Sequence, residues 1–233
     1  MKKFSLFLLF FLFQTAEMLA GPGGRIARQV FDSPIGRVVL VLLIIILLPL
    51  IIRNIWIQRK GVKNTTAILT KLGAKHPSLF DEIQLKNRVT SVFGRVHKGW
   101  SDQDVSEASG YMTDWYWQNQ QMLFLDKWKS EGLRNVCNVK SITGIKPIHI
   151  RITEKPNFEE SRIFYSIDSE MEDYLIHEER QKIVEGKKGF NHVSTVWTMK
   201  LTNGQWLVDN IEQSGSALDY VKREDIVPQS VMA

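Results

Sequence analysis

Cysteine and metal-binding patterns are scarce in this sequence. Cys137 is the single cysteine among 233 residues, which excludes an internal disulfide and a cysteine-rich zinc cluster. The five histidines include no pair at metal-ligand spacing, and neither a nucleophile elbow nor a phosphate-binding loop occurs. We therefore expect no metal, no cofactor and no catalytic residue, which favours a binding protein over an enzyme.

A net positive charge is absent outside the first quarter of the chain. Residues 1–63 carry nine Lys or Arg and two acidic residues, whereas residues 64–233 carry 21 basic and 23 acidic residues. The sequence pI of about 9.2 therefore reflects the N-terminal part. Because nucleic-acid-binding domains usually have a basic face, we expect no nucleic-acid partner.

Two long apolar runs lie within the first 57 residues. Residues 1–20 begin with Lys2 and Lys3 and continue as an apolar stretch, the layout of a signal peptide or an uncleaved signal anchor. Residues 21–34 are predicted to form a Gly-rich loop. Residues 35–57 are long and apolar enough for a transmembrane helix.

Basic residues flank the predicted span on both sides. Before it lie Arg25, Arg28 and Arg37, and beyond it a basic connector covers residues 58–78. The excess of basic residues after the span predicts that the following domain is cytoplasmic. Four of these basic side chains are candidates for contact with anionic lipid, namely Arg53, Arg59, Lys60 and Lys63. The alternative is that they serve only to set the orientation of the span in the membrane.

Residues 79–215 change from helical to strand periodicity. Apolar residues recur at helical spacing over residues 80–100, a short second helix follows to Met112, and a third runs to about Leu133. After Asn135 the period changes to two, with apolar and polar residues alternating over residues 148–153, 163–172 and 192–201. Asn203 and Gly204 predict a tight hairpin turn. We therefore expect an α+β fold with three helices packed on a curved antiparallel sheet, followed by a polar tail over residues 216–233.

The end of this domain carries a family resemblance. Residues 193–213, VSTVWTMKLTNGQWLVDNIEQ, resemble the end of the Tim forty-four-like domain, which belongs to the nuclear-transport-factor-two-like superfamily. The helix that ends at Trp100, before Ser101, Asp102, Gln103 and Asp104, is also similar. The resemblance covers about residues 79–215 and implies a cystatin-like or nuclear-transport-factor-two-like cone.

The resemblance also implies a non-enzymatic role. Domains of this family tether proteins or lipids at the cytoplasmic or matrix face of an energy-coupling membrane, and the layout of this chain is similar to that of bacterial inner-membrane members involved in protein transport. The chain departs from the mitochondrial relative because it has its own predicted span and no long chaperone-recruiting region.

Two groups of residues in the domain are candidate sites. An apolar cavity inside the cone would be lined by Phe93, Trp100, Tyr165, Trp197, Met199 and Trp206, which are core residues if the cavity is filled. A candidate acidic face for basic partner segments comprises Asp168, Glu170, Glu172 and Asp173. The alternative for this face is a solvated outer strand surface whose charges discourage edge pairing.

Three functions remain open at this point. The first is a membrane-tethered adaptor with membrane lipid, client proteins or a second copy of the chain as partners. The second is a periplasmic scaffold subunit of a secretion machine. The third, a small-molecule enzyme, requires an inward-facing acid in an open pocket. Strand parity directs Asp168, Glu170 and Glu172 away from the inner face and leaves the side of Asp209 ambiguous.

Overall fold

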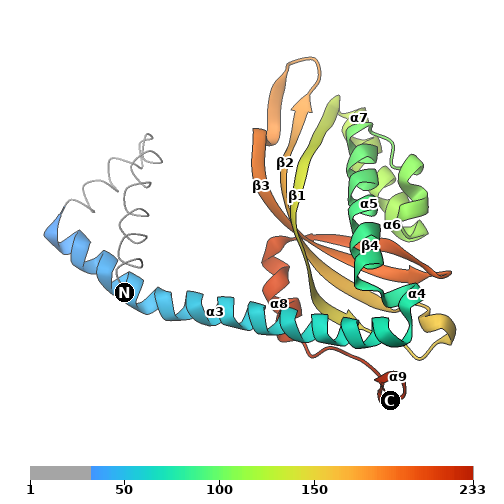
Figure 1. Ribbon diagram of the computed structural model, residues 1–233. Helices are drawn as coiled ribbons and strands as arrows, with labels where there is room; N and C mark the ends of the chain where they lie inside the picture. The colour runs from blue at the N-terminus through green and yellow to red at the C-terminus, as the bar shows by residue number, and fades with distance from the viewer. Residues whose placement is uncertain (1–32, 233) are drawn as a thin grey trace. The chain divides into compact units, whose positions relative to one another are not determined.

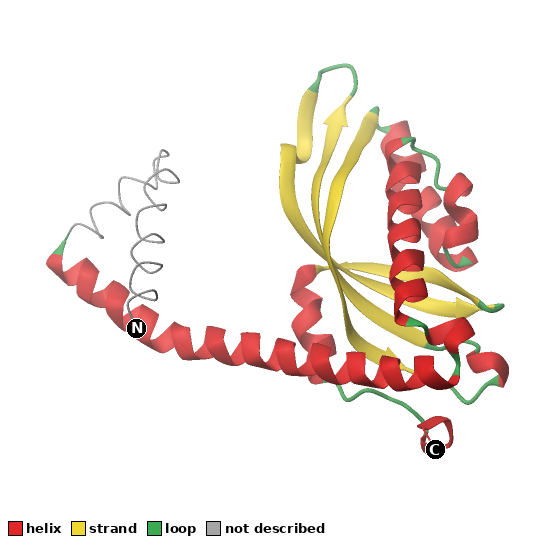
Figure 2. Ribbon diagram, viewed as in Figure 1, coloured by secondary structure: helices red, strands yellow, loops and turns green. Residues whose placement is uncertain are grey.

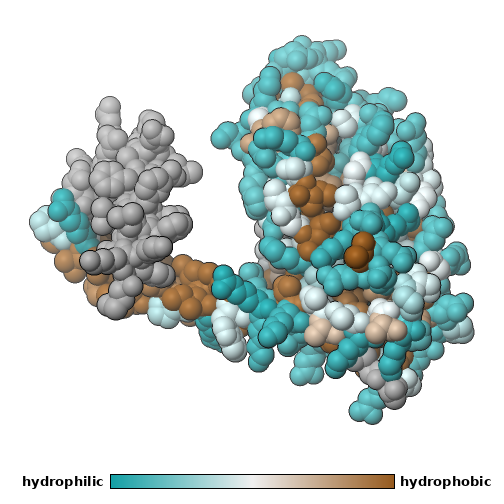
Figure 3. Space-filling view, viewed as in Figure 1, coloured by the Kyte–Doolittle hydropathy of each residue, from teal (hydrophilic) through white to brown (hydrophobic). Residues whose placement is uncertain are grey.

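The computed structural model describes residues 33–232, in a chain that divides into two compact units at Ile55 and Trp56. The predicted signal segment at residues 1–20, and most of the predicted loop at 21–34, lie outside the described residues. Helix α3 (Pro34–Lys75) begins in the first unit and contains Pro49. Its first part is apolar and solvent-exposed (Figure 3). By length and composition, α3 is the one described helix able to cross a membrane.

The C-terminal part of α3 belongs to the second unit. The expected basic connector is helical as far as Lys75, and its Leu69 and Leu72 are buried in the core of the domain. Gly61 packs so closely on Val221 that a Cβ there would lie 2.4 Å from Val221 Cγ1. The connector therefore differs from the expectation, because apolar residues at helical spacing give it a face that the domain covers.

The helices that follow match the three predicted ones in order. They are α4 (Pro77–Phe80), α5 (Glu82–Ser101), the 3₁₀ segment η2 (Ser106–Tyr111), α6 (Asp114–Gln120), the π-helical segment η3 (Gln121–Leu125) and α7 (Asp126–Ser130). Asp81 caps α5 by accepting a 2.9 Å hydrogen bond from the N–H of Gln84. The second predicted helix is only a 3₁₀ segment, and the third contains a π-helical turn.

A four-stranded antiparallel sheet forms the rest of the domain and confirms the α+β class. Its strands lie in sequence order, β1 (Leu133–Arg151), β2 (Arg162–His177), β3 (Lys182–Thr202) and β4 (Gln205–Gln213). The predicted hairpin turn is confirmed, since Asn203 and Gly204 have φ values of 51° and 75°, as a type I′ turn requires.

The main core lies between α5 and the inner face of the sheet (Figures 1 and 2). Val89, Val92 and Phe93 of α5 are buried in the same cluster as Ile163 and Tyr165 of β2. A second cluster lies on the outer face, where Ile148 and Val196 of the sheet pack with Tyr220 and Val221. The sheet is therefore covered on both faces at this end.

The C-terminal residues fold back on the sheet rather than forming the expected polar tail. They comprise η5 (Ser214–Ser216), α8 (Ala217–Lys222) and α9 (Gln229–Met232), and Ile226 makes a parallel bridge to Arg151. Asp225 accepts hydrogen bonds from Thr65 Oγ1 at 3.0 Å and from the N–H of Ile150 at 2.8 Å. This carboxylate therefore joins α3, β1 and the C-terminal segment.

Candidate functional site

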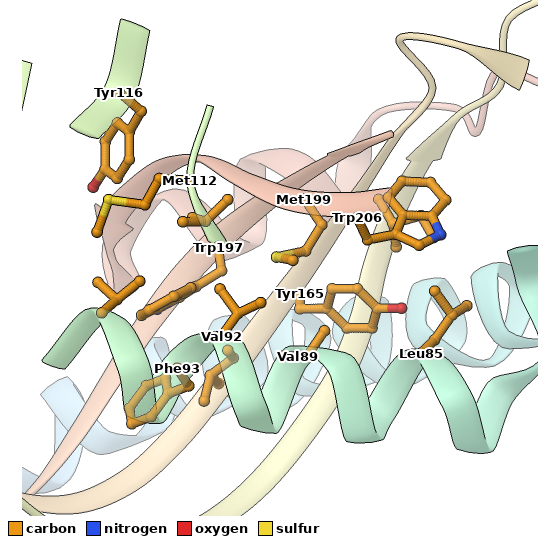
Figure 4. Close-up of a cluster of buried hydrophobic side chains, with 14 of the residues drawn as sticks. Leu85, Val89, Val92, Phe93, Met112, Tyr116, Tyr165, Trp197, Met199 and Trp206 are labelled. Atoms are coloured by element: carbon orange, nitrogen blue, oxygen red, sulfur yellow. The ribbon is translucent and has the colours of Figure 1, made fainter. Parts of the chain in front are cut away.

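Five of the six predicted cavity residues form the filled core of the domain (Figure 4). Phe93, Tyr165, Trp197 and Met199 are at most 2% exposed, and Trp206 is 5% exposed. The rings of Phe93 and Trp197 lie 5.0 Å apart, and Trp206 Nε1 donates a 2.8 Å hydrogen bond to a backbone carbonyl of the helical layer. These side chains therefore pack against one another rather than around an open space.

The open cavity lies beside this core and includes the sixth residue, Trp100. Its volume is about 470 Å³, and it lies between the end of α5, the segments α6, η3 and α7, and the sheet. That volume is within the range of ligand-binding pockets. Aromatic side chains form much of its wall, namely Trp100, Tyr116, Phe124, Trp128 and Tyr174. Of these five, only Trp100 was predicted from the sequence to line a cavity.

The polar lining of the cavity includes three carboxylates beside uncharged amide and hydroxyl groups. Asp173, Glu185 and Glu212 line it, and none of the described lining residues is Lys or Arg. Glu212 accepts hydrogen bonds from the hydroxyl of Tyr220 at 3.0 Å and from Asn210 Nδ2 at 2.9 Å. Within residues 33–232, neither Asp173 nor Glu185 takes part in an ion pair.

Asp173 lies in an environment that disfavours its charge. Surrounding protein atoms raise the pKa of Asp173 by displacing water, and the nearby charge of Glu185 raises it further. A hydrogen bond from Asn135 acts in the opposite direction. A carboxylate held near a second carboxylate gains from any cation that enters the cavity.

His97 supplies a neutral acceptor to the same cavity. It is 5% exposed, and its Nδ1–H donates a 2.8 Å hydrogen bond to the carbonyl of Phe93. Burial lowers the pKa of His97 to about 4, so the ring is uncharged near neutral pH. Because Nδ1 carries the proton, Nε2 keeps a free lone pair, and His97 lines the cavity. This role was not predicted, because a histidine on the apolar face of α5 is equally compatible with core packing.

Gly186 allows β3 to approach β2 closely at the cavity rim. Its φ is +79°, and a Cβ there would lie 2.5 Å from the carbonyl oxygen of Asp173. Any larger residue would clash with the backbone of β2 and adopt a strained conformation. The neighbouring Glu185 therefore depends on this glycine for its place beside Asp173.

The predicted acidic face divides between the two sides of the sheet. Asp168 forms an ion pair with Lys146 at 2.7 Å, and Glu170 forms one with Lys140 at 2.8 Å. Glu172 accepts a 2.6 Å hydrogen bond from the N–H of Gly189. These three acids face outward, as strand parity predicted, but β1 lysines neutralise two of them.

The fourth acid of the predicted face, Asp173, reaches the cavity instead, next to Glu185. Pairing between strands decides which acids are neutralised, and single-strand patterns do not contain that information. The ambiguity over Asp209 is also resolved. Asp209 accepts a hydrogen bond from Thr113 at 3.0 Å and pairs with Arg162 at 3.3 Å, and it is not among the residues that line the cavity.

The four predicted membrane-surface residues all lie on α3 and are exposed, namely Arg53, Arg59, Lys60 and Lys63. Lys60 Nζ lies 5.2 Å from the centroid of the Trp56 ring, a cation–π contact. At 100° per residue, Lys60 and Lys63 lie roughly opposite buried Leu69 and Leu72 on α3, whereas Arg59 lies to one side.

The described residues contain no group of three His, Cys, Asp or Glu that could hold a metal ion. Cys137 is buried, and burial raises the pKa of its thiol, which disfavours the reactive thiolate. The cavity therefore combines aromatic surface, hydrogen-bond acceptors and unpaired negative charge. Such an arrangement suits the binding of a positively charged group.

Comparison with known proteins identified no family model and no curated protein that matches this chain. Among solved structures, the intermembrane space region of the chloroplast protein ARC6 is similar to 54% of this chain and 95% of that chain. The TM-score is 0.39 and the sequence identity is 8%, values too low to support an argument about fold family or function.

Proposed function

We propose that this protein is a membrane-tethered, non-enzymatic adaptor whose domain binds another protein. The observation that carries the proposal is the open, aromatic cavity with unpaired carboxylates, in a chain whose α3 is long and apolar enough to span a membrane. An anchor concentrates the binding domain at one surface, which raises its effective concentration for partners there.

The proposed family and location rest on the sequence. The segment that resembles the Tim forty-four-like domain forms most of the β3–β4 hairpin, and helices precede the antiparallel sheet as a nuclear-transport-factor-two-like cone requires. The basic residues after the apolar stretch support a cytoplasmic domain at a bacterial inner membrane, with Arg53, Arg59, Lys60 and Lys63 near anionic lipid. A role in protein transport follows from the same resemblance.

Reporter fusions test the proposed side of the membrane. The reporter belongs after Ala233, because Tyr220, Val221 and Asp225 pack on the sheet and a fusion at residue 213 would remove them. We expect fluorescence from a cytoplasmic green fluorescent protein fusion and no activity from a fused alkaline phosphatase. The opposite pattern would reject the adaptor at the cytoplasmic face and favour a periplasmic scaffold.

Photocrosslinking in cells tests the proposed binding function. A photoreactive amino acid replaces Phe124, which lines the cavity and is 43% exposed, in the full-length chain. Ile83, which is 70% exposed at the start of α5, provides the control position. We expect discrete protein adducts from position 124 only. Identical adducts at both positions, or lipid adducts alone at position 124, would contradict the proposal.

A second candidate function is favoured by one observation. Asp173 is an acid at an open cavity with a raised pKa, which is the feature that an enzyme of this fold requires. Incubation of the full-length protein with a cell metabolite extract, followed by mass spectrometry, tests this alternative. Conversion of a metabolite by the wild type but not by Asp173→Asn would favour the enzyme over the adaptor.

A further inference from the structure

The cavity wall is complementary to positive charge. Five aromatic side chains line it, and its charged lining residues are all acidic. Ring faces attract Lys and Arg electrostatically, and carboxylates form charge-assisted hydrogen bonds with them. An anionic ligand such as a phosphate group would meet no basic partner among the described lining residues.

The carboxylates of the cavity differ from those on the outer face of the same sheet. Asp168 and Glu170 each pair with a lysine of β1, whereas Asp173 and Glu185 have no ion pair within the described part of the chain. The two unpaired acids lie near enough for Glu185 to influence the ionisation of Asp173. A cation placed between them would relieve this repulsion.

His97 provides independent evidence for a hydrogen-bond donor in the ligand. The side chain is more than nine-tenths buried, and its Nδ1–H is already bonded to the Phe93 carbonyl. None of the hydrogen bonds formed by the described residues engages Nε2, which leaves an unused acceptor on a residue that lines the cavity. An ammonium or guanidinium group carries several N–H donors and could satisfy this acceptor together with the carboxylates.

The rim of the cavity indicates that the cation belongs to a larger molecule. The π-helical turn η3 exposes Met122, Leu123 and Phe124, with exposed fractions of 68%, 59% and 43%. Phe124 and the adjacent Leu125 also line the cavity, so apolar surface continues from the wall to the exterior. Such π-helical turns are frequent at functional sites. A protein segment with apolar residues beside a basic one would contact both surfaces, whereas a free amine would not.

We propose that the cavity receives a lysine or arginine side chain of a partner protein, with the flanking apolar residues of that segment packed on Phe124, which lines the cavity and is also exposed. The carboxylates of Asp173 and Glu185 pair with the cation, and His97 Nε2 accepts one of its N–H groups. This assignment rests on the proposed binding function and names the chemistry of its partner.

Matched peptides test the assignment with the full-length protein in lipid nanodiscs. The probes are fluorescein-labelled heptapeptides, Gly-Ser-Leu-Xaa-Leu-Ser-Gly, in which the central residue is Lys, Arg, norleucine or Glu. Fluorescence anisotropy measures binding, with empty nanodiscs as the blank. We expect the Lys and Arg peptides to bind at least tenfold more tightly than the norleucine peptide, and the Glu peptide to bind more weakly still. Equal affinity of the Lys and norleucine peptides would overturn the proposal.

Two double variants separate the cavity from general electrostatics. Asp173→Asn with Glu185→Gln removes the unpaired acids, and Asp168→Asn with Glu170→Gln removes the same charge from the outer face. We expect at least a tenfold loss of Lys-peptide affinity for the first and less than a twofold change for the second. Thermal unfolding confirms that both variants fold. Equal losses in the two variants would reject the cavity as the cation site.

Competition with n-butylammonium distinguishes a protein segment from a free amine. We expect the amine to displace the Lys peptide only at concentrations at least a hundredfold above the peptide Kd, whereas displacement at comparable concentrations would overturn the assignment to a protein segment. If the Lys and norleucine peptides bind equally but crosslinks at position 124 persist, cation recognition by the cavity is rejected. The proposed adaptor function would then remain supported.

Discussion

Two halves of the same inner sheet face use similar residues for different purposes. In the first half, Phe93, Tyr165, Trp197 and Met199 interlock and exclude solvent. In the second half, Trp100, Tyr116, Phe124 and Trp128 surround an open cavity. Both halves are rich in aromatic side chains, so aromatic content alone does not distinguish a core from a binding surface.

Polar groups mark the difference between the two halves. The filled half contains few titratable groups, whereas Asp173, Glu185 and Glu212 line the open half. Burying unpaired carboxylates in a closed core would cost several kcal/mol each. An open cavity leaves them partly hydrated, and Asp173 and Glu185 remain exposed, which is why the acids are compatible with this half only.

Removing one large aromatic side chain from each half should produce the largest contrast. Trp197→Ala empties a fully buried position, and we expect it to lower the free energy of unfolding by about 3–5 kcal/mol. Trp128→Ala only enlarges an existing opening, so we expect a loss of about 1 kcal/mol or less. Chemical denaturation of both variants checks this difference, and equal losses would mean that the cavity is as closely packed as the core.

Lowering the pH should reduce the stability of the domain through His97, which lies where the filled core meets the cavity. Its folded pKa of about 4 lies below the ordinary 6.5, so the unfolded chain binds a proton first as the pH falls. The free energy of unfolding should therefore decrease between pH 6.5 and pH 4, by on the order of 3 kcal/mol. His97→Phe preserves an aromatic ring and removes this titration. Identical pH dependence of the variant and the wild type between these values would contradict the prediction.

Two aspartates should respond differently to loss of their charge or side chain. Asp225 accepts hydrogen bonds from the Thr65 hydroxyl and from the N–H of Ile150. We therefore expect Asp225→Ala to lower the free energy of unfolding by about 1–3 kcal/mol. Asp173 has a raised pKa, which means that folding disfavours its charge, and Asp173→Asn should leave stability unchanged or slightly increased at pH 7. Thermal melts of the two variants provide the measurement. A large loss for Asp173→Asn would show that this residue serves the fold rather than the ligand.

Local patterns predicted part of the fold correctly. The dipeptide Asn203 and Gly204 has the positive φ values of a hairpin turn because few other residues adopt that conformation readily. Strand alternation placed Asp168, Glu170 and Glu172 on the outer face, as the burial of β2 confirms. The first halves of β1 and β3 were not predicted, since much of their length is exposed and lacks regular alternation.

Burial of the two segments that flank the domain depended on distant partners. Leu69 and Leu72 were assigned to a connector, and Tyr220 and Val221 to a polar tail, because each segment is mostly polar when read alone. The structure buries the first pair in the main core and the second pair on the outer face of the sheet. A short segment needs only a few apolar residues to pack when the remainder of the domain supplies a complementary surface.

The sequence alone determined the apolar segment, the α+β class and the alternation of the strands, because these properties follow from local periodicity and composition. Only the tertiary structure decided which aromatic residues fill the core and which surround the cavity, and which acids have lysine partners. Those outcomes depend on contacts between β1, β2, β3 and the helices, which lie far apart in the chain. Local periodicity determines which side of a strand a residue occupies, but long-range packing determines what it contacts there.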